Sequence, residues 1–151
     1  MKYMREALKQ AKYAREKGEV PVGCIIVQND RIIARAYNQT VQLHDPTAHA
    51  EMIAITQAAE SLQNERLSNT TMYVTIEPCP MCAGAIILAR IGRVVYGTNE
   101  PKWGAAGSLY DILQDGKLNH TPEVSGGILR EDCSAILQAF FADKRKKFAE
   151  N

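Results

Sequence analysis

Apolar residues recur at spacings that divide the chain into helices and strands. Spacings of three and four predict amphipathic helices over residues 2–17 and 48–63 and from residue 131 onward. A further helix is expected over 81–90, where the side chains are apolar nearly all round, as in a helix buried on most sides. A short helical piece is expected over 108–113. Short apolar runs predict strands over 20–28, 31–38, 71–76 and 93–98 and a weaker one over 123–129.

The order of these elements predicts the fold class. The short Asn29–Asp30 link between the first two strands indicates a hairpin, and therefore an antiparallel part of a sheet. Strands joined through a helix indicate a parallel part, reached by right-handed crossovers. We therefore expect one α/β domain over residues 1–151, a three-layer α/β/α sandwich with a mixed five-stranded sheet between the helices.

Composition narrows the cellular setting. The net charge of +1 gives no indication of a nucleic-acid partner. No apolar run approaches the roughly 18 residues of a membrane span, and the charged N-terminal segment lacks the apolar stretch of a signal peptide. We expect a cytoplasmic protein with no membrane contact.

The four cysteines fall into two groups. In a reducing cytoplasm, the close pair Cys79 and Cys82 indicates a metal-binding or redox-active site, whereas Cys24 and Cys133 are expected to be buried packing residues.

Two predicted helix starts carry residues that can bind a metal. His49 begins one helix, and Cys79 and Cys82 begin the next, with a strand between them. One nitrogen and two sulfur ligands form a set that suits zinc. A structural zinc site usually has four protein ligands, whereas a catalytic one has three and leaves a position for water. The pattern therefore favours a catalytic zinc site.

Glu51 stands two positions after His49, which is an unusual spacing for two helical residues that share a site. Residues two apart on a helix point about 200° from each other, so they cannot both face a site beside the helix. Both can reach a site at its N-terminal end. There the Glu51 carboxylate could act as general base and then as general acid.

Each motif taken singly has an ordinary explanation. A histidine and a glutamate in a first helical turn are usually surface residues, and a lone C-x-x-C pattern can be a redox pair or an accident. Together the two motifs match H-x-E…P-C-x-x-C, the signature of the zinc deaminases.

Longer stretches of the chain resemble one family. "HDPTAHAEM", "YVTIEPCPMCAGAI" and "RIGRVVYGTNEPKWGAAGS" are similar to the bacterial tRNA-specific adenosine deaminases, and the resemblance runs from about residue 5 to residue 145. It implies a cytidine deaminase-like fold and hydrolytic conversion of adenosine to inosine at the wobble position of a tRNA anticodon. It also implies an arginine tRNA as substrate, one zinc ion per subunit, and a homodimer with residues of both subunits near each site.

The resemblance also implies roles for single residues. His49, Cys79 and Cys82 would hold the zinc ion, and Glu51 would shuttle protons. Asn38 matches an asparagine that contacts the flipped nucleotide. Without the family, Asn38 would be interpreted as a turn residue.

Residues 99–108 match a loop that contacts the anticodon backbone and neighbouring bases. Glu100 stands where family members commonly carry aspartate, and Lys102 is a phosphate-binding candidate. A glycine-rich surface turn is the alternative interpretation of this loop.

Three other functions stay open at this point. A deaminase of a free base, guanine or cytosine, would use the same zinc ligands. A non-catalytic zinc module would have no use for a proton shuttle such as Glu51. A thiol redox protein would cycle its two cysteines and bind no metal.

Overall fold

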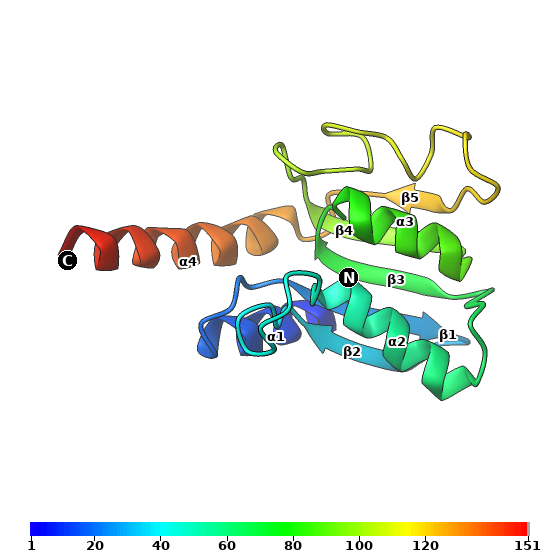
Figure 1. Cartoon of the computed structure of the whole chain (residues 1–151), viewed down its shortest axis with the longest axis horizontal. Coiled ribbons are helices and arrows are strands. Elements are labelled where there is room, and N and C mark those ends of the chain that lie inside the picture. Colours follow the sequence, from blue (N-terminus) through cyan, green and yellow to red (C-terminus); the bar gives the residue numbers. More distant parts are fainter. Residues whose placement is uncertain (151) are drawn as a thin grey trace.

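The computed structural model describes residues 1–150, and it has the predicted order of helices and strands (Figure 1). The elements are α1 (Lys2–Glu16), β1 (Gly23–Gln28), β2 (Arg31–Tyr37), α2 (Ala50–Leu62), β3 (Thr71–Ile76), α3 (Pro80–Ala89), β4 (Arg93–Thr98), β5 (Glu123–Ser125) and α4 (Arg130–Glu150).

The strands form one mixed sheet in the order β2-β1-β3-β4-β5. Strand β1 pairs antiparallel with both β2 and β3, whereas β3, β4 and β5 run parallel. The hairpin turn consists of Asn29 and Asp30, both with positive φ, 51° and 59°. Positive φ at both positions is the geometry of a tight turn that matches the twist of its strands. The predicted hairpin and the predicted mixed sheet are therefore confirmed.

Helices cover both faces of the sheet, as the predicted three-layer sandwich requires. The larger core joins α2 and α3 to one face, through buried side chains such as Ala54, Ile86 and Met72. A smaller cluster on the other face joins α1 and α4 through Met4, Leu8 and Cys133. Figure 1 shows α4 continuing beyond the edge of the sheet. Within residues 1–150, no helix combines the length and the apolarity of a membrane span.

The expectation of a helical piece over 108–113 is wrong. Those residues form turns, held by an isolated bridge between Ala106 and Asp111. The N–H groups of Leu109 and Tyr110 both donate to the Gly104 carbonyl, so the chain folds back on the preceding loop. The last strand is also shorter than predicted: it ends at Ser125 and not at residue 129.

Helix α1 lies very close to strand β1 at Gly23. A Cβ added there would collide with the Ala7 carbonyl and lie 2.6 Å from the Ala11 amide nitrogen. The absence of a side chain at Gly23 therefore sets how closely α1 packs on the sheet.

We predict that Gly23→Ala lowers the free energy of unfolding by about 1–3 kcal/mol, because the helix must move to admit the methyl group. Urea unfolding followed by circular dichroism measures the loss. Gly84→Ala is the matched control, since an added Cβ there meets no atom within 4 Å. Equal midpoints for Gly23→Ala and the parent protein would contradict this account of the packing.

Candidate active site

His49 caps helix α2 at the end of a well-ordered turn. The Asp45 carboxylate accepts hydrogen bonds from the Thr47 N–H (2.9 Å) and hydroxyl (2.7 Å), which shapes the chain just before the helix. His49 has extended backbone angles, and its carbonyl accepts the first helical hydrogen bond, from the Ile53 N–H. The half-buried imidazole is thereby placed at the N-terminal end of α2.

Cys79 occupies the same position on helix α3 as His49 does on α2. It is the N-cap residue, and Pro80 follows in the first turn, where a missing N–H costs no hydrogen bond. Cys82 lies one turn further and is fully buried. Because α2 and α3 pack side by side on one face of the sheet, their N-termini meet at one end of it.

The three side chains converge on a point that fits a zinc ion. The Nδ1 atom of His49 lies 3.6 Å from the Cys79 sulfur and 3.5 Å from the Cys82 sulfur. Tetrahedral zinc, with Zn–S bonds of about 2.3 Å and Zn–N bonds of about 2.0–2.1 Å, separates a sulfur from a nitrogen ligand by about 3.6 Å. All three ligand atoms lie within 4.8 Å of one another, and among residues 1–150 they form the one such cluster.

The protonation of the two thiols also suits a metal. A hydrogen bond from Cys82, together with the nearby His49, lowers the pKa of Cys79 to about 4, which favours the thiolate form of this sulfur. The interaction with Cys79 and burial raise the pKa of Cys82 far above its usual value. Thiolate is the form of cysteine that binds metals, and a bound dication displaces the proton of a thiol.

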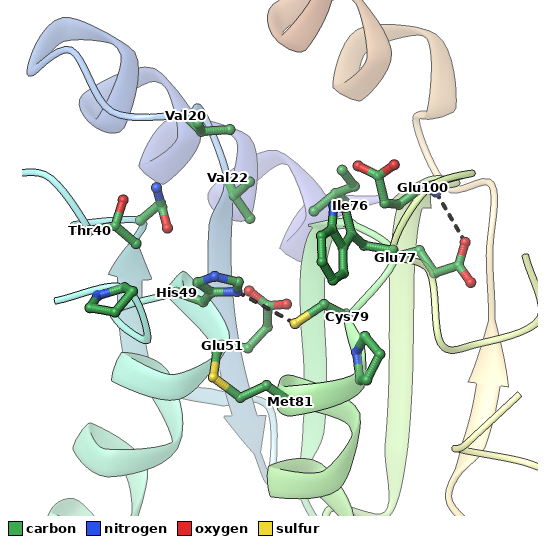
Figure 2. Close-up of a pocket in the computed structure, with 14 residues that line it drawn as sticks. Val20, Val22, Thr40, His49, Glu51, Ile76, Glu77, Cys79, Met81 and Glu100 are labelled. Carbon is green, nitrogen blue, oxygen red and sulfur yellow. Dashed lines mark hydrogen bonds between the residues drawn. The ribbon is translucent and has the colours of Figure 1, made fainter. Parts of the chain in front are cut away.

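Glu51 lies beside this cluster without belonging to it. Its side chain is only 3% exposed, and Figure 2 shows its carboxylate next to the His49 ring. Burial raises the pKa of Glu51 above its usual value. A carboxyl group with a raised pKa exchanges protons more readily near neutral pH, as a general acid–base requires.

A pocket of about 490 Å³ opens over His49, Cys79 and Glu51. Asn38, which is 6% exposed at the end of β2, lines it, as do Glu100 and Trp103 from the loop after β4. The other side chains that line it are Val20, Val22, Thr40, Pro46, Ile76, Glu77, Pro80 and Met81. The structure thus places five of the sequence-predicted residues, Asn38, His49, Glu51, Cys79 and Glu100, around one cavity. Cys82 is buried beside His49 and Cys79 and does not line the cavity, and Lys102 is exposed on the loop.

The sequence did not reveal two residues of this region, Glu77 and Trp103. The Glu77 carboxylate is buried and accepts five hydrogen bonds from the loop after β4. Burial alone would raise its pKa, but the Ser108 hydroxyl and the N–H groups of Ser108, Glu100 and Ala106 lower it below the usual value. An acidic residue that directly follows a buried strand was the signal that could have identified it.

The chain is similar to known proteins. Residues 1–98 match the family described as the cytidine and deoxycytidylate deaminase zinc-binding region. The tRNA-specific adenosine deaminase of Bacillus subtilis (strain 168) is 50% identical over 145 residues, which are 96% of this chain and 90% of that protein. The chain belongs to the tRNA-specific adenosine deaminase family. The family resemblance expected from the sequence is therefore confirmed.

Solved structures of deaminases have the same fold. One comes from studies of A-to-I editing by tRNA:A34 deaminases at the wobble position of transfer RNA. It is 44% identical, with a TM-score of 0.86, and the match covers 89% of this chain and 97% of that one. A guanine deaminase from Nitrosomonas europaea reaches a TM-score of 0.81 at 22% identity, covering 92% and 82% of the two chains. The second likeness extends to the fold alone. The predicted cytidine deaminase-like fold is confirmed.

We predict that Cys82→Ser lowers the zinc content of the purified protein to a small fraction of the parent's, because a buried hydroxyl replaces a thiolate ligand. Elemental analysis by mass spectrometry measures it. Cys133→Ser is the matched control, since Cys133 is equally buried but lies on the opposite face of the sheet. Zinc retained in full by Cys82→Ser would remove Cys82 from the ligand set.

Proposed function

We propose that this chain is a zinc-dependent hydrolase that deaminates adenosine to inosine at the wobble position of a tRNA anticodon. The observation that carries the proposal is a pocket that lies over a cluster of three potential metal ligands and over a buried carboxylate outside that cluster. The relative from Bacillus subtilis and the solved tRNA:A34 deaminase support the substrate.

The proposed roles follow from the chemistry of each group. His49, Cys79 and Cys82 hold the zinc ion, one per subunit. When bound, zinc supplies Lewis-acid chemistry, which lowers the pKa of a water ligand to about 7. Three protein ligands leave a coordination position for that water.

Glu51 moves the protons of the reaction. Its carboxylate takes one proton from the attacking water as the C6–O bond forms and delivers it to the ring nitrogen N1. It then takes the remaining proton from the new C6 hydroxyl and delivers it to the N6 amino group as the C6–N6 bond breaks. Adenosine and water are thereby converted to inosine and ammonia. The raised pKa of Glu51 lets one carboxyl group both accept and return a proton.

The walls of the pocket suit a nucleobase that is flipped out of the RNA strand. Val22 and Ile76 give the cavity apolar sides, and Asn38 contributes an amide that can hydrogen-bond the nucleotide. Glu100 and Lys102 are proposed substrate contacts from the loop after β4, to ribose and phosphate. An anticodon loop is single-stranded, so moving its base into the pocket costs less than opening a duplex would.

The finer points rest on the family resemblance. We infer that the substrate is the anticodon stem-loop of an arginine tRNA, that the enzyme acts in the cytoplasm, and that it works as a homodimer. Apolar side chains support a partner surface, since Leu88 on α3 is 81% exposed and Leu109 and Tyr110 after β4 are also exposed.

We predict that Glu51→Gln retains zinc and loses activity by about 10²–10⁴-fold, because the amide keeps the shape of the side chain but cannot carry a proton between atoms. Inosine formed in tRNA is measured by nucleoside mass spectrometry. Glu65→Gln is the control, since Glu65 is exposed. Equal rates of inosine formation by the Glu51 variant and the parent would disprove the proton-shuttle role, whereas no inosine from either protein would favour a non-catalytic zinc module.

We also predict that an anticodon stem-loop with adenosine at the wobble position is converted, whereas free guanine and free cytosine are not. The same stem-loop with adenosine moved one position away from the wobble site is the control substrate. Chromatography of the products separates inosine, xanthine and uracil. Turnover of guanine or cytosine together with an inert stem-loop would instead establish a free-base deaminase.

A further inference from the structure

The loop 99–108 is fixed to the end of β3 by one buried carboxylate. Glu77 accepts hydrogen bonds from the Glu100 N–H (3.1 Å) and the Asn99 side chain (3.3 Å) where the loop begins. It accepts others from the N–H groups of Ala106 (2.9 Å) and Ser108 (3.0 Å) and from the Ser108 hydroxyl, where the loop ends. Figure 2 shows Glu77 joined to Glu100 by one of these bonds. The loop is thus anchored on both sides of its tip.

Further hydrogen bonds restrict the backbone of this loop. The Gly104 N–H donates to the Glu100 carbonyl (2.8 Å), and the Ala105 N–H donates to the Pro78 carbonyl (2.8 Å). A Cβ on Gly104 would lie 2.5 Å from the carboxyl carbon of Glu77, so the loop passes directly over that carboxylate. The backbone that directly follows Trp103, at Gly104 and Ala105, is therefore fixed by hydrogen bonds.

Trp103 itself is an exposed aromatic side chain on this fixed loop. It is 64% exposed, and it lines the mouth of the pocket that contains Glu51. A large aromatic ring loses little conformational entropy when a flat ligand covers it, since it has two rotatable bonds and a fixed base. Nucleobases stack on such rings whatever their sequence, because every base has a π-face.

We propose that Trp103 is a stacking platform for a nucleobase next to the target adenosine, presented by the loop that Glu77 fixes. The inference rests on the proposed function. A target base within an RNA strand brings its neighbours to the mouth of the pocket, where Trp103 lies. Lys102 precedes the ring and is exposed, so its charge is available to the phosphate that links the two nucleotides. Stacking at this position increases the affinity for RNA more than it discriminates between bases.

The protein offers a direct optical test, because Trp103 is its only tryptophan. The inactive Glu51→Gln protein is titrated with anticodon stem-loops while tryptophan fluorescence is recorded. Each neighbour of the wobble adenosine is replaced in turn by an abasic nucleotide. We expect the intact stem-loop to quench the fluorescence and one abasic position to abolish most of that quenching at saturation. Undiminished quenching with every abasic stem-loop would overturn the proposal, as would binding without any change in fluorescence.

Kinetics provide the second readout. We expect Trp103→Ala to raise KM for the stem-loop by roughly 5- to 100-fold and to change kcat little, and Trp103→Phe to restore most of the affinity. Tyr13→Ala is the matched control, because Tyr13 is an exposed aromatic on α1, outside the pocket lining. An unchanged KM for Trp103→Ala would contradict the platform. A parent protein that leaves the intact stem-loop unconverted would instead overturn the proposed function.

The positioning role of Glu77 is tested separately. In Glu77→Gln, an NH₂ group must face at least one N–H donor of the loop, so we expect Trp103 to gain mobility and its fluorescence anisotropy to fall while zinc stays bound. Ser108→Ala, which removes one donor, should show the same change to a smaller degree if Glu77→Gln does not fold. Glu19→Gln is the control, since buried Glu19 holds the N–H groups of Val41 and Gln42 on a different segment. Unchanged anisotropy in both Glu77→Gln and Ser108→Ala would rule out the anchoring role.

Discussion

The side-by-side packing of α2 and α3 is the constraint on which the site depends. Each helix covers the same face of the sheet, so their first residues emerge at the same end of it. His49 caps one helix and Cys79 caps the other, which places a nitrogen and two sulfurs at the spacing of tetrahedral ligands. A site made of helix ends also gains from the partial positive charge there, which favours thiolates.

The same constraint explains how Glu51 lies beside the proposed metal ligands without belonging to their cluster. Residues 49 and 51 diverge around the axis of α2, yet at the helix end both reach the space beyond it. The imidazole then takes the position nearest the sulfurs, and the carboxylate lies beside it against apolar walls. Burial raises the pKa of that carboxyl group, which an exposed glutamate on the side of the helix would not experience.

Sequence patterns predicted the parts of the molecule that depend on local periodicity. Helix α1 and strands β3 and β4 lie where the spacing of apolar residues predicted them. The three proposed metal ligands could be named because each stands beside a predicted helix start. The fold-back over 108–113 could not be predicted from the side-chain pattern of that segment. It depends on backbone hydrogen bonds that Leu109 and Tyr110 donate to the carbonyl of Gly104, which lies outside the segment. Glu77 was missed for the same reason, since its five donors come from residues more than 20 positions away.

Two carboxylates close to the proposed metal ligands thus acquire opposite acid–base properties from their surroundings. Glu51 is buried beside apolar walls, so its charged form is disfavoured and its pKa rises. Glu77 faces a ring of N–H and O–H donors, so its charged form is favoured and its pKa falls despite burial. The first group is therefore suited to the proposed proton transfer, whereas the second favours the charged form, which accepts the hydrogen bonds of the loop. The same side-chain type thereby provides both the proposed proton carrier and the anchor of the loop at the pocket, and the difference lies in how many hydrogen-bond donors each carboxylate meets.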